Sequence, residues 1–280
     1  MKKSFPPIPA ALLSMVSVQS GSSVAKGLFP VLGPGLTSSL RLGLSAVLLF
    51  LINRPKLFQL TKKQWLHCCG YGFCTASMNL IFYFAIQRIP IGLGVTVEFL
   101  GPLLLALLFS RKITDLIWIF FATLGIALIV PWTSTGIDPL GLFLAFMAGV
   151  FWAGYILFGG KVTQVMPTRS AVTISTGIAA LLVLPFGLFS GALGMLNMKL
   201  LAVAFSVALL SSAIPFTLDL VALRKLPTKT FSILTSLQPA FGALSGLIFL
   251  NEILTLNQWV SIACVITASI GTTLTGGRKK

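Results

Sequence analysis

The stretch AIQRIP at residues 85–90 returns as ALRKLP at residues 222–227, 137 positions later in the chain. The same offset places Pro102 on Pro239, so a loop and the helix that follows it recur in register. We interpret this match as an internal repeat that divides the chain into two related halves. How the halves are oriented depends on how many helical segments each one contains.

Composition places the chain among polytopic helical membrane proteins. Of its 280 residues, 56% are hydrophobic and only 9% are charged, whereas ordinary soluble domains carry about 25% charged residues. A water-soluble fold could not bury so much apolar surface. At about 20 residues per crossing, there is room for about ten helices with short loops. Apolar windows broken by Gly, Pro and charge predict ten spans, at about 8–28, 35–52, 65–87, 91–110, 113–131, 138–159, 170–190, 199–222, 228–250 and 256–275.

The distribution of basic residues supports ten spans with both termini in the cytoplasm. This topology places 16 of the 20 Lys and Arg residues on the inner side and only Arg88 and Lys199 on the outer side. Cytoplasmic loops are rich in Lys and Arg, so the net charge of +15 follows from topology and does not indicate a nucleic-acid partner. Lys2 and Lys3 before an apolar run imitate a secretory signal. We interpret this start as an uncleaved first helix, because the later spans need it to complete their pattern.

Each half of the repeat, residues 1–134 and 135–280, contains five predicted spans. An odd number inverts the second copy, so the loop at Arg88 lies outside and its copy at Arg224 lies inside. The expected fold is therefore all-α and polytopic, with ten transmembrane helices as two inverted five-helix repeats. Inverted repeats are common in secondary transporters, whose substrate sites lie near the bilayer midplane between the halves. A repeat can also be a remnant of ancestry without a mechanistic role.

An acidic residue lies deep inside a predicted span, in the run VTVEFLGP at residues 95–102. Glu98 is about 10 Å from the start of its span at 1.5 Å per residue. An ionised carboxylate there costs about 2.5–3.5 kcal/mol, so we expect it to face an aqueous cavity or a partner. Pro102 has no N–H and its ring crowds the carbonyl of residue 98, so Glu98 offers a carboxylate and a freed carbonyl. Pro239 has the same effect on Thr235 in the ninth span.

Glu98 also has a structural interpretation, in which its carboxylate pairs with Arg41 or Lys26 inside the bundle. Other polar and aromatic residues within the spans are candidates for the same cavity, although each could instead form a helix–helix contact. These candidates are Gln19, Ser20, Asn79, Tyr83, Trp152, Tyr155, Ser211, Ser236 and Gln238.

Two further acidic residues have simpler explanations. We expect Asp219, near the inner end of the eighth span, to pair with Arg224 or Lys225 in the adjoining loop. We expect Glu252, which follows the ninth span, to mark the outer end of that helix.

The sequence contains no catalytic or metal-binding pattern. The four cysteines lack the spacing of a metal or redox site, and we expect them to act as small reduced hydrophobic side chains. HExxH and paired catalytic aspartates within spans are absent, and the single histidine, His67, is expected at the membrane interface. We therefore expect no enzyme, no cofactor and no metal. A channel is the other rival to a carrier, and saturable, gradient-coupled flux would separate the two.

Several segments give the chain a resemblance to a known family. They are SVQSGSSVAKGLFP (17–30), SLRLGL (39–44), MNLIFYFAIQRIPIGLGVTVEFLGPL (78–103), LPTKTFSILTSLQPA (226–240) and GLIFLNEILT (246–255). With them the chain resembles the drug/metabolite transporter superfamily, in its EamA group, and is most similar to bacterial threonine/homoserine exporters. The resemblance implies an inner-membrane efflux carrier for amino acids and related metabolites, with a central cavity and a proton link. The first half has FSRKITD where the second has FLNEILT, which argues against a symmetric role for Glu252.

A threonine-like substrate is a zwitterion with a hydroxyl group, and the candidate residues can be assigned to its parts. We expect Glu98 and the freed carbonyls to meet the ammonium group, and Arg41 either to meet the carboxylate or only to brace the bundle. A second expected role of Glu98, in place of ammonium binding or in addition to it, is to carry the coupling proton. Competition between the proton and the ammonium group for one site would give antiport. The expected partners are the substrate, protons and membrane lipid. The alternative is export of another metabolite or drug, such as an aromatic amino acid, a purine or a nucleotide derivative. Donors to the polar remainder of the substrate would be Asn79, Tyr83 and Gln238.

Overall fold

The computed structural model describes residues 6–55, 57–108, 117–118, 120–121, 124–125, 128, 138–226, 231, 234–235 and 237–276. Most of the fifth predicted span (113–131), the predicted boundary between the halves (134–135) and Ser236 lie outside these ranges. Within them the chain is helical, without strands. The elements are α1 (Pro7–Asn53), η1 (Leu57–Gln59), α2 (Lys62–Ile86), α3 (Ile91–Glu98), α4 (Leu100–Leu108), α6 (Pro139–Val165), α7 (Thr168–Leu188), η2 (Leu193–Met195), α8 (Met198–Ala208), η3 (Leu209–Ala213), α9 (Ile214–Lys225), α11 (Gln238–Leu250) and α12 (Leu256–Gly276).

Several helices are long and apolar enough to cross a membrane. Among the described residues, α1, α2, α6, α7 and the continuous run Met198–Lys225 meet this condition. Shorter apolar helices cover Ile91–Leu105, Gln238–Leu250 and Leu256–Ala268. A helix satisfies its own backbone hydrogen bonds, as a lipid environment requires. The helical content and the apolar character agree with the predicted all-α membrane class.

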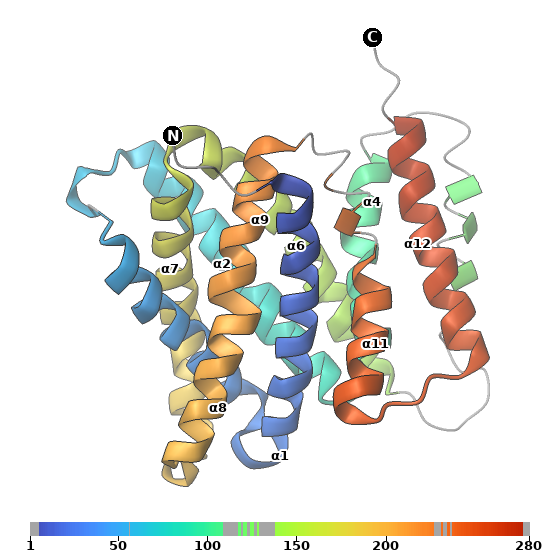
Figure 1. Cartoon of the computed structure of the whole chain (residues 1–280), viewed down its shortest axis with the longest axis horizontal. Coiled ribbons are helices and arrows are strands. Elements are labelled where there is room, and N and C mark those ends of the chain that lie inside the picture. Colours follow the sequence, from blue (N-terminus) through green and yellow to red (C-terminus); the bar gives the residue numbers. More distant parts are fainter. Residues whose placement is uncertain are drawn as a thin grey trace.

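A single glycine joins the first two predicted spans. α1 covers both of them, and the chain turns at Gly33, which has φ 68° and ψ 166°. Glycine adopts this positive-φ conformation without the steric cost of a Cβ. Pro30 and Pro34 flank the turn, and each lacks the backbone N–H that would continue the helical ladder. We call the parts of α1 before and after Gly33 its first and second arms, and Figure 1 shows them diverging from this turn.

The fourth and ninth predicted spans are both interrupted close to their prolines. A turn at Phe99, three residues before Pro102, separates α3 from α4. α11 begins directly after a turn at Leu237, two residues before Pro239. Because proline cannot donate to the helical ladder and crowds the preceding turn, a helix break lies close to the proline in each of the two predicted repeats.

Basic residues gather at one end of the helix bundle. α1 and α9 end there beside Arg54 and Arg224, and α2 and α7 begin there with Lys62 and Arg169 (Figure 1). The start of α1 and the finish of α12 lie at this same end. The opposite end, where α2 finishes and α8 begins, carries Arg88. We call these the basic end and the opposite end.

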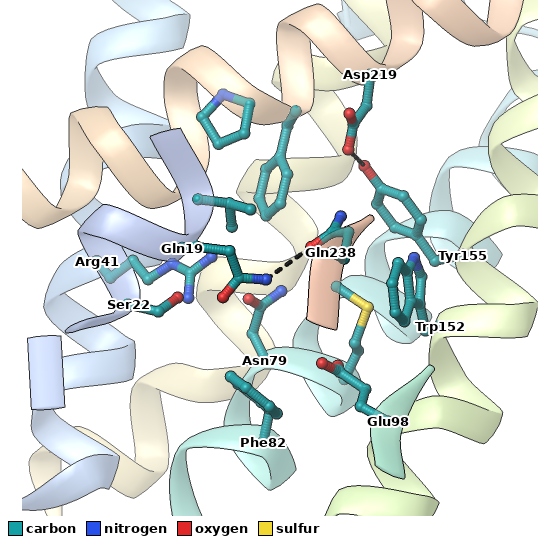
Figure 2. A pocket seen from close by; sticks show the side chains of 14 residues that line it. Gln19, Ser22, Arg41, Asn79, Phe82, Glu98, Trp152, Tyr155, Asp219 and Gln238 are labelled. Carbon is teal, nitrogen blue, oxygen red and sulfur yellow. Dashed lines mark hydrogen bonds between the residues drawn. The ribbon is translucent and has the colours of Figure 1, made fainter. Parts of the chain in front are cut away.

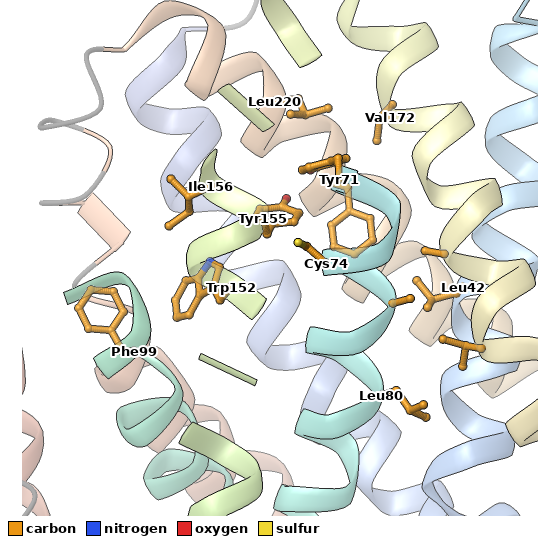
Figure 3. Packing of buried hydrophobic residues seen from close by; sticks show 14 of the residues in the cluster. Leu42, Tyr71, Cys74, Leu80, Phe99, Trp152, Tyr155, Ile156, Val172 and Leu220 are labelled. Carbon is orange, nitrogen blue, oxygen red and sulfur yellow. The ribbon is translucent and has the colours of Figure 1, made fainter. Parts of the chain in front are cut away.

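Aromatic pairs hold α2, α6 and the α3–α4 turn together at the centre of the bundle. Tyr71 stacks on Tyr155 with ring centroids 4.7 Å apart, and Phe99 meets Trp152 edge-on at 5.4 Å. Aromatic rings prefer these stacked and edge-on arrangements. Figure 3 shows the four rings within the main apolar cluster. The pairs therefore fix where α6 presents Trp152 and Tyr155.

Candidate functional site

A small polar cavity lies among helices from both halves of the chain. Its volume is about 60 Å³, which is room for a few water molecules. Helices α1, α2, α3, α6, α9 and α11 contribute side chains to its wall, and Figure 2 shows how these side chains converge. The lining residues are Val18, Gln19, Ser22, Arg41, Met78, Asn79, Phe82, Glu98, Trp152, Tyr155, Pro215, Phe216, Asp219 and Gln238.

Seven of the predicted cavity residues line this cavity, and Ser20, Tyr83, Ser211 and Thr235 do not. Tyr83 and Thr235 are buried outside the wall, and the kink residues Pro102 and Pro239 are also absent from it. Tyr83 contacts Arg41, whose Nη1 donates to the Tyr83 hydroxyl over 2.9 Å. A role in binding stays a prediction for the members of the wall, which are Gln19, Arg41, Asn79, Glu98, Trp152, Tyr155 and Gln238.

Arg41, on the second arm of α1, is a buried cation whose hydrogen-bond partners are all neutral. Nε donates to Ser212 Oγ over 2.7 Å, Nη1 donates to Tyr83, and Nη2 donates to the carbonyl of Ser211. Both serines lie in η3, a π-helical segment of the kind that often marks functional sites. Arg41 is 1% exposed, and no described carboxylate lies within 4.0 Å of its guanidinium. Its guanidinium therefore has no salt-bridge partner in the described part of the chain.

Glu98 faces the same cavity with its carboxylate unpaired. It is the last residue of α3, it is buried, and no described residue forms a hydrogen bond or ion pair with its carboxylate. The structural pairing considered from sequence is absent, because Arg41 binds neutral groups and Lys26 lies 2.6 Å from Glu252. The cavity thus holds a buried cation and a buried carboxylate without a salt bridge between them.

The backbone carbonyl of Glu98 has a different role from the one expected. Pro102 leaves it without its helical donor, but the oxygen lies against the backbone of Gly149 on α6. A Cβ at Gly149 would overlap this oxygen, and a Cβ at Gly101 would overlap the carbonyl of Gly149. The freed carbonyl therefore serves close packing of the α3–α4 junction against α6, and the carboxylate is the part of Glu98 that lines the cavity.

Replacing Gly149 with alanine should weaken the fold. The new Cβ has no space against the Glu98 carbonyl, and overpacking of this kind costs about 1–3 kcal/mol. Gly160, on the same helix, has no atom within 4 Å of its Cβ position, so Gly160→Ala is the matched control and should be neutral or slightly stabilising. Thermal unfolding in detergent checks this prediction, and equal midpoints for the two variants would contradict the tight contact.

Three amide side chains border the cavity. Gln19 Nε2 donates to Gln238 Oε1 over 2.7 Å, which joins α1 to α11. The Gln19 oxygen is buried without a partner in the described part of the structure. Asn79 Nδ2 donates one N–H to the carbonyl of Thr75 over 2.7 Å, which leaves its second N–H and its oxygen for other partners. These groups can exchange hydrogen bonds with a small polar solute.

A second carboxylate on the cavity, Asp219, was missed from the sequence. The expected pairing with Arg224 or Lys225 is wrong, because Asp219 accepts hydrogen bonds from Ser14 Oγ over 2.6 Å and from Tyr155 Oη over 3.2 Å. These bonds tie α9 to the first arm of α1 and to α6. Asp219 is therefore a contact point of three helices and not a loop-facing charge.

The signal that could have identified Asp219 is helical spacing. Pro215 and Asp219 are four residues apart, so they share one face of α9, and both line the cavity. Figure 2 shows Asp219 and Glu98 on opposite sides of the hydrogen bond between Gln19 and Gln238. The other lining residues that were not among the predicted site residues are Val18, Ser22, Met78, Phe82, Pro215 and Phe216.

Removing a donor to Asp219 should destabilise the protein by an amount that depends on the charge of Asp219. Ser14→Ala removes a hydrogen bond to a charged group, which contributes about 1.5–3 kcal/mol. In an Asp219→Asn background the loss should be about half as large, since neutral hydrogen bonds are weaker. A double-mutant cycle in thermal unfolding measures the difference. Ser17→Ala is the control, because the Ser17 hydroxyl donates to a backbone carbonyl; equal losses from Ser14→Ala in both backgrounds would contradict the coupling.

An ion pair joins three segments at the opposite end of the bundle. Lys26 Nζ lies 2.6 Å from Glu252 Oε1 and donates to the carbonyl of Ile89 over 2.9 Å. Glu252 Oε2 accepts a hydrogen bond from the backbone N–H of Ile91 over 2.8 Å. Glu252 therefore does more than mark a helix end, because it ties the segment after α11 to α1 and to the start of α3.

Comparisons with known proteins identify a family, and also relatives that align with almost the whole chain. A model of the EamA-like transporter family matches residues 139–274. The threonine/homoserine exporter RhtA of Salmonella typhimurium (strain LT2) is 40% identical over 274 residues, covering 96% of this chain and 92% of the relative. RhtA of Escherichia coli (strain K12) is 39% identical over 272 residues with the same coverage. A crystal structure aligns with a TM-score of 0.67 at 17% identity, over 96% of this chain and 98% of the other, which shows a shared fold.

Proposed function

Because the chain belongs to the EamA-like transporter family, we propose that it is a secondary active transporter that exports small amino acids, such as threonine and homoserine, across the inner membrane. The family consists of transporters and not enzymes, and the apolar helices make this chain a multi-pass membrane protein. One observation carries the substrate proposal: one small cavity is lined by the cation of Arg41 and the carboxylate of Glu98, and neither has a salt-bridge partner among the described residues. A zwitterion presents the complementary pair of charges.

The proposed architecture has ten spans, arranged as inverted repeats over residues 1–134 and 135–280, with both termini in the cytoplasm. Two observations support it. α2 ends at the opposite end of the bundle, whereas α9, which carries the repeated motif, ends at the basic end (Figure 1). The basic end also carries the kind of charge that cytoplasmic loops collect.

In the proposed binding mode, the guanidinium of Arg41 meets the substrate carboxylate and the carboxylate of Glu98 meets the ammonium group. The amides of Gln19, Asn79 and Gln238 then exchange hydrogen bonds with the substrate hydroxyl. A cavity of about 60 Å³ is smaller than an amino acid, so binding requires the helices around it to separate. The small size and paired charges favour a short zwitterion over the alternative substrates, an aromatic amino acid, a purine or a nucleotide derivative.

Proton antiport follows if Glu98 binds either a proton or the ammonium group, but not both. A carboxylate that has lost its proton attracts the substrate cation, whereas a protonated one does not. Entry of a proton therefore displaces the substrate, and the protein returns with the proton in its place. Moving one charge inward gains about 2.3 kcal/mol per 100 mV, which can drive export against a concentration gradient.

The direct test is flux from proteoliposomes loaded with radiolabelled threonine or homoserine, with and without a pH gradient. We expect saturable efflux that a pH gradient accelerates. The same assay with an aromatic amino acid and a purine should give little flux. Flux of these compounds in place of threonine and homoserine would overturn the substrate proposal, and flux that does not saturate would indicate a channel.

A further inference from the structure

A long apolar groove runs along the outside of the bundle, away from the polar cavity. It lies between the second arm of α1 and α7, and Leu57 and Trp65 close it near the basic end. Its volume is about 660 Å³, and its wall is almost entirely apolar. The hydroxyl of Ser39, the one serine in this wall, already donates to the carbonyl of Val183. The groove therefore suits a hydrocarbon ligand and offers no polar group for recognition along its length.

Small residues line this space on the two facing helices. Gly43 and Ala46 face it from α1, and Gly177 and Ala180 face it from α7. A Cβ at Gly43 would meet no atom within 4 Å. At Gly177 a Cβ would lie 2.8 Å from the Phe50 ring, so this glycine makes room for Phe50. The open space is therefore a consequence of residue size on the α1 side, at Gly43.

The length of the groove matches the depth of one membrane leaflet. Its α1 wall extends from Ser39 to Leu51, which corresponds to about 18 Å at 1.5 Å per residue. The hydrocarbon core of a bilayer is about 30 Å thick, so one leaflet is about 15 Å deep. A single acyl chain that starts at the basic end would fill the groove.

Exposed basic residues lie within a few residues of the wall at the end of the groove where such a lipid would place its headgroup. Arg54 follows the α1 wall, and Lys62 lies one helical turn before Trp65, a residue type that favours the membrane interface. Asn53 donates to Thr173 over 2.8 Å, which brings the end of α1 to the first turns of α7 and therefore near Arg169. None of these three basic residues has an ion pair within the described residues.

We propose that this groove is a binding site for an anionic glycerophospholipid. One acyl chain lies between α1 and α7, and the phosphate group contacts Arg54, Lys62 and Arg169, which we call the basic rim. The basic rim supplies the preference for an anionic headgroup, and the groove supplies the affinity for the acyl chain. The site belongs to the leaflet at the basic end and does not depend on which solute the protein transports.

The experiment is a titration of the purified full-length protein with phosphatidylglycerol and with phosphatidylcholine of matched chains, read by native mass spectrometry. We expect tighter binding of phosphatidylglycerol. Each basic residue near a membrane surface contributes about fivefold to binding of an anionic lipid, so Arg54→Gln with Lys62→Gln should reduce the preference about 25-fold. Lys161→Gln with Arg224→Gln is the matched control, because both are exposed residues of the basic end that do not flank the groove in sequence.

Binding of the acyl chain is tested with a matched pair of glycine substitutions. Gly43→Leu should fill the groove and weaken both lipids without changing their ratio. Gly27→Leu is the control, because Gly27 is also on α1 with no atom within 4 Å of its Cβ position and does not line the groove. Equal binding of the two lipids, or equal effects of the two glycine variants, would overturn the proposal. Competition by inorganic phosphate alone would identify a free-anion site and would also overturn it.

Discussion

Replacing Glu98 with glutamine should abolish export of threonine driven by a pH gradient while leaving the protein folded. Glutamine keeps the shape of the side chain but has no charge for an ammonium group and no site for a proton. Loss of one partner of a buried charged contact costs about 2–5 kcal/mol, which corresponds to a decrease in flux of about 30-fold to several thousand-fold. Radiolabelled threonine efflux from proteoliposomes, with and without the gradient, measures it.

Two controls make the Glu98 result interpretable. Glu98→Asp keeps a carboxylate and should retain part of the coupled flux. The elution profile and unfolding midpoint of Glu98→Gln should match those of the unmodified protein, because no described residue forms a hydrogen bond with the Glu98 side chain. Gradient-driven export at an undiminished rate in Glu98→Gln would remove this residue from both the binding and the coupling mechanism.

Replacing Arg41 with lysine should abolish recognition of the substrate carboxylate. Lysine keeps the charge but cannot reproduce the three-way donation to Ser212, Tyr83 and the carbonyl of Ser211, because an ammonium group lacks the planar fork of a guanidinium. A misplaced cation at a buried site should weaken substrate binding by about 2–5 kcal/mol. Threonine flux should therefore fall roughly 30-fold or more. Kinetics of threonine and of its carboxamide, which has no carboxylate, measure the effect.

The comparison of the two compounds separates binding from bracing. The unmodified protein should strongly prefer threonine over the carboxamide, and Arg41→Lys should lose most of that preference. Tyr83→Phe is the matched control, since it removes one acceptor of Arg41 from outside the cavity wall. A parallel decrease for both compounds in Arg41→Lys, with the preference kept, would mean that Arg41 only holds α1 against η3.

The apolar helices in the described part of the chain could be predicted from the sequence because apolar length is a local property. The contacts between helices could not, because they join residues far apart in the chain, as the bond between Gln19 and Gln238 does. Glu98 was found because a charge deep in an apolar run is conspicuous. Asp219 was missed because it precedes two basic residues, which offered an explanation that needed no tertiary structure.

Geometry that depends on backbone detail was also beyond the sequence. The proline before the end of a span predicts a freed carbonyl, but only the position of Gly149 shows that the carbonyl is used for packing. In the same way, glycine between two prolines suggests a connection, but not that Gly33 alone makes the turn. Such features depend on which residues lie against the turn or carbonyl in the folded protein. Those residues are far apart in the sequence.

The π-helical segment η3 amounts to one extra residue in the helix that runs from Met198 to Lys225. In an α-helix each residue turns the chain by about 100°, so deleting one residue within Leu209–Ala213 would rotate α9 by about that angle relative to α8. Either Asp219 would leave the cavity wall, or the face of α8 that packs on α1 would be exposed. The position is thus intolerant of length change, and an insertion or deletion there should be far more damaging than any single substitution in the same five residues.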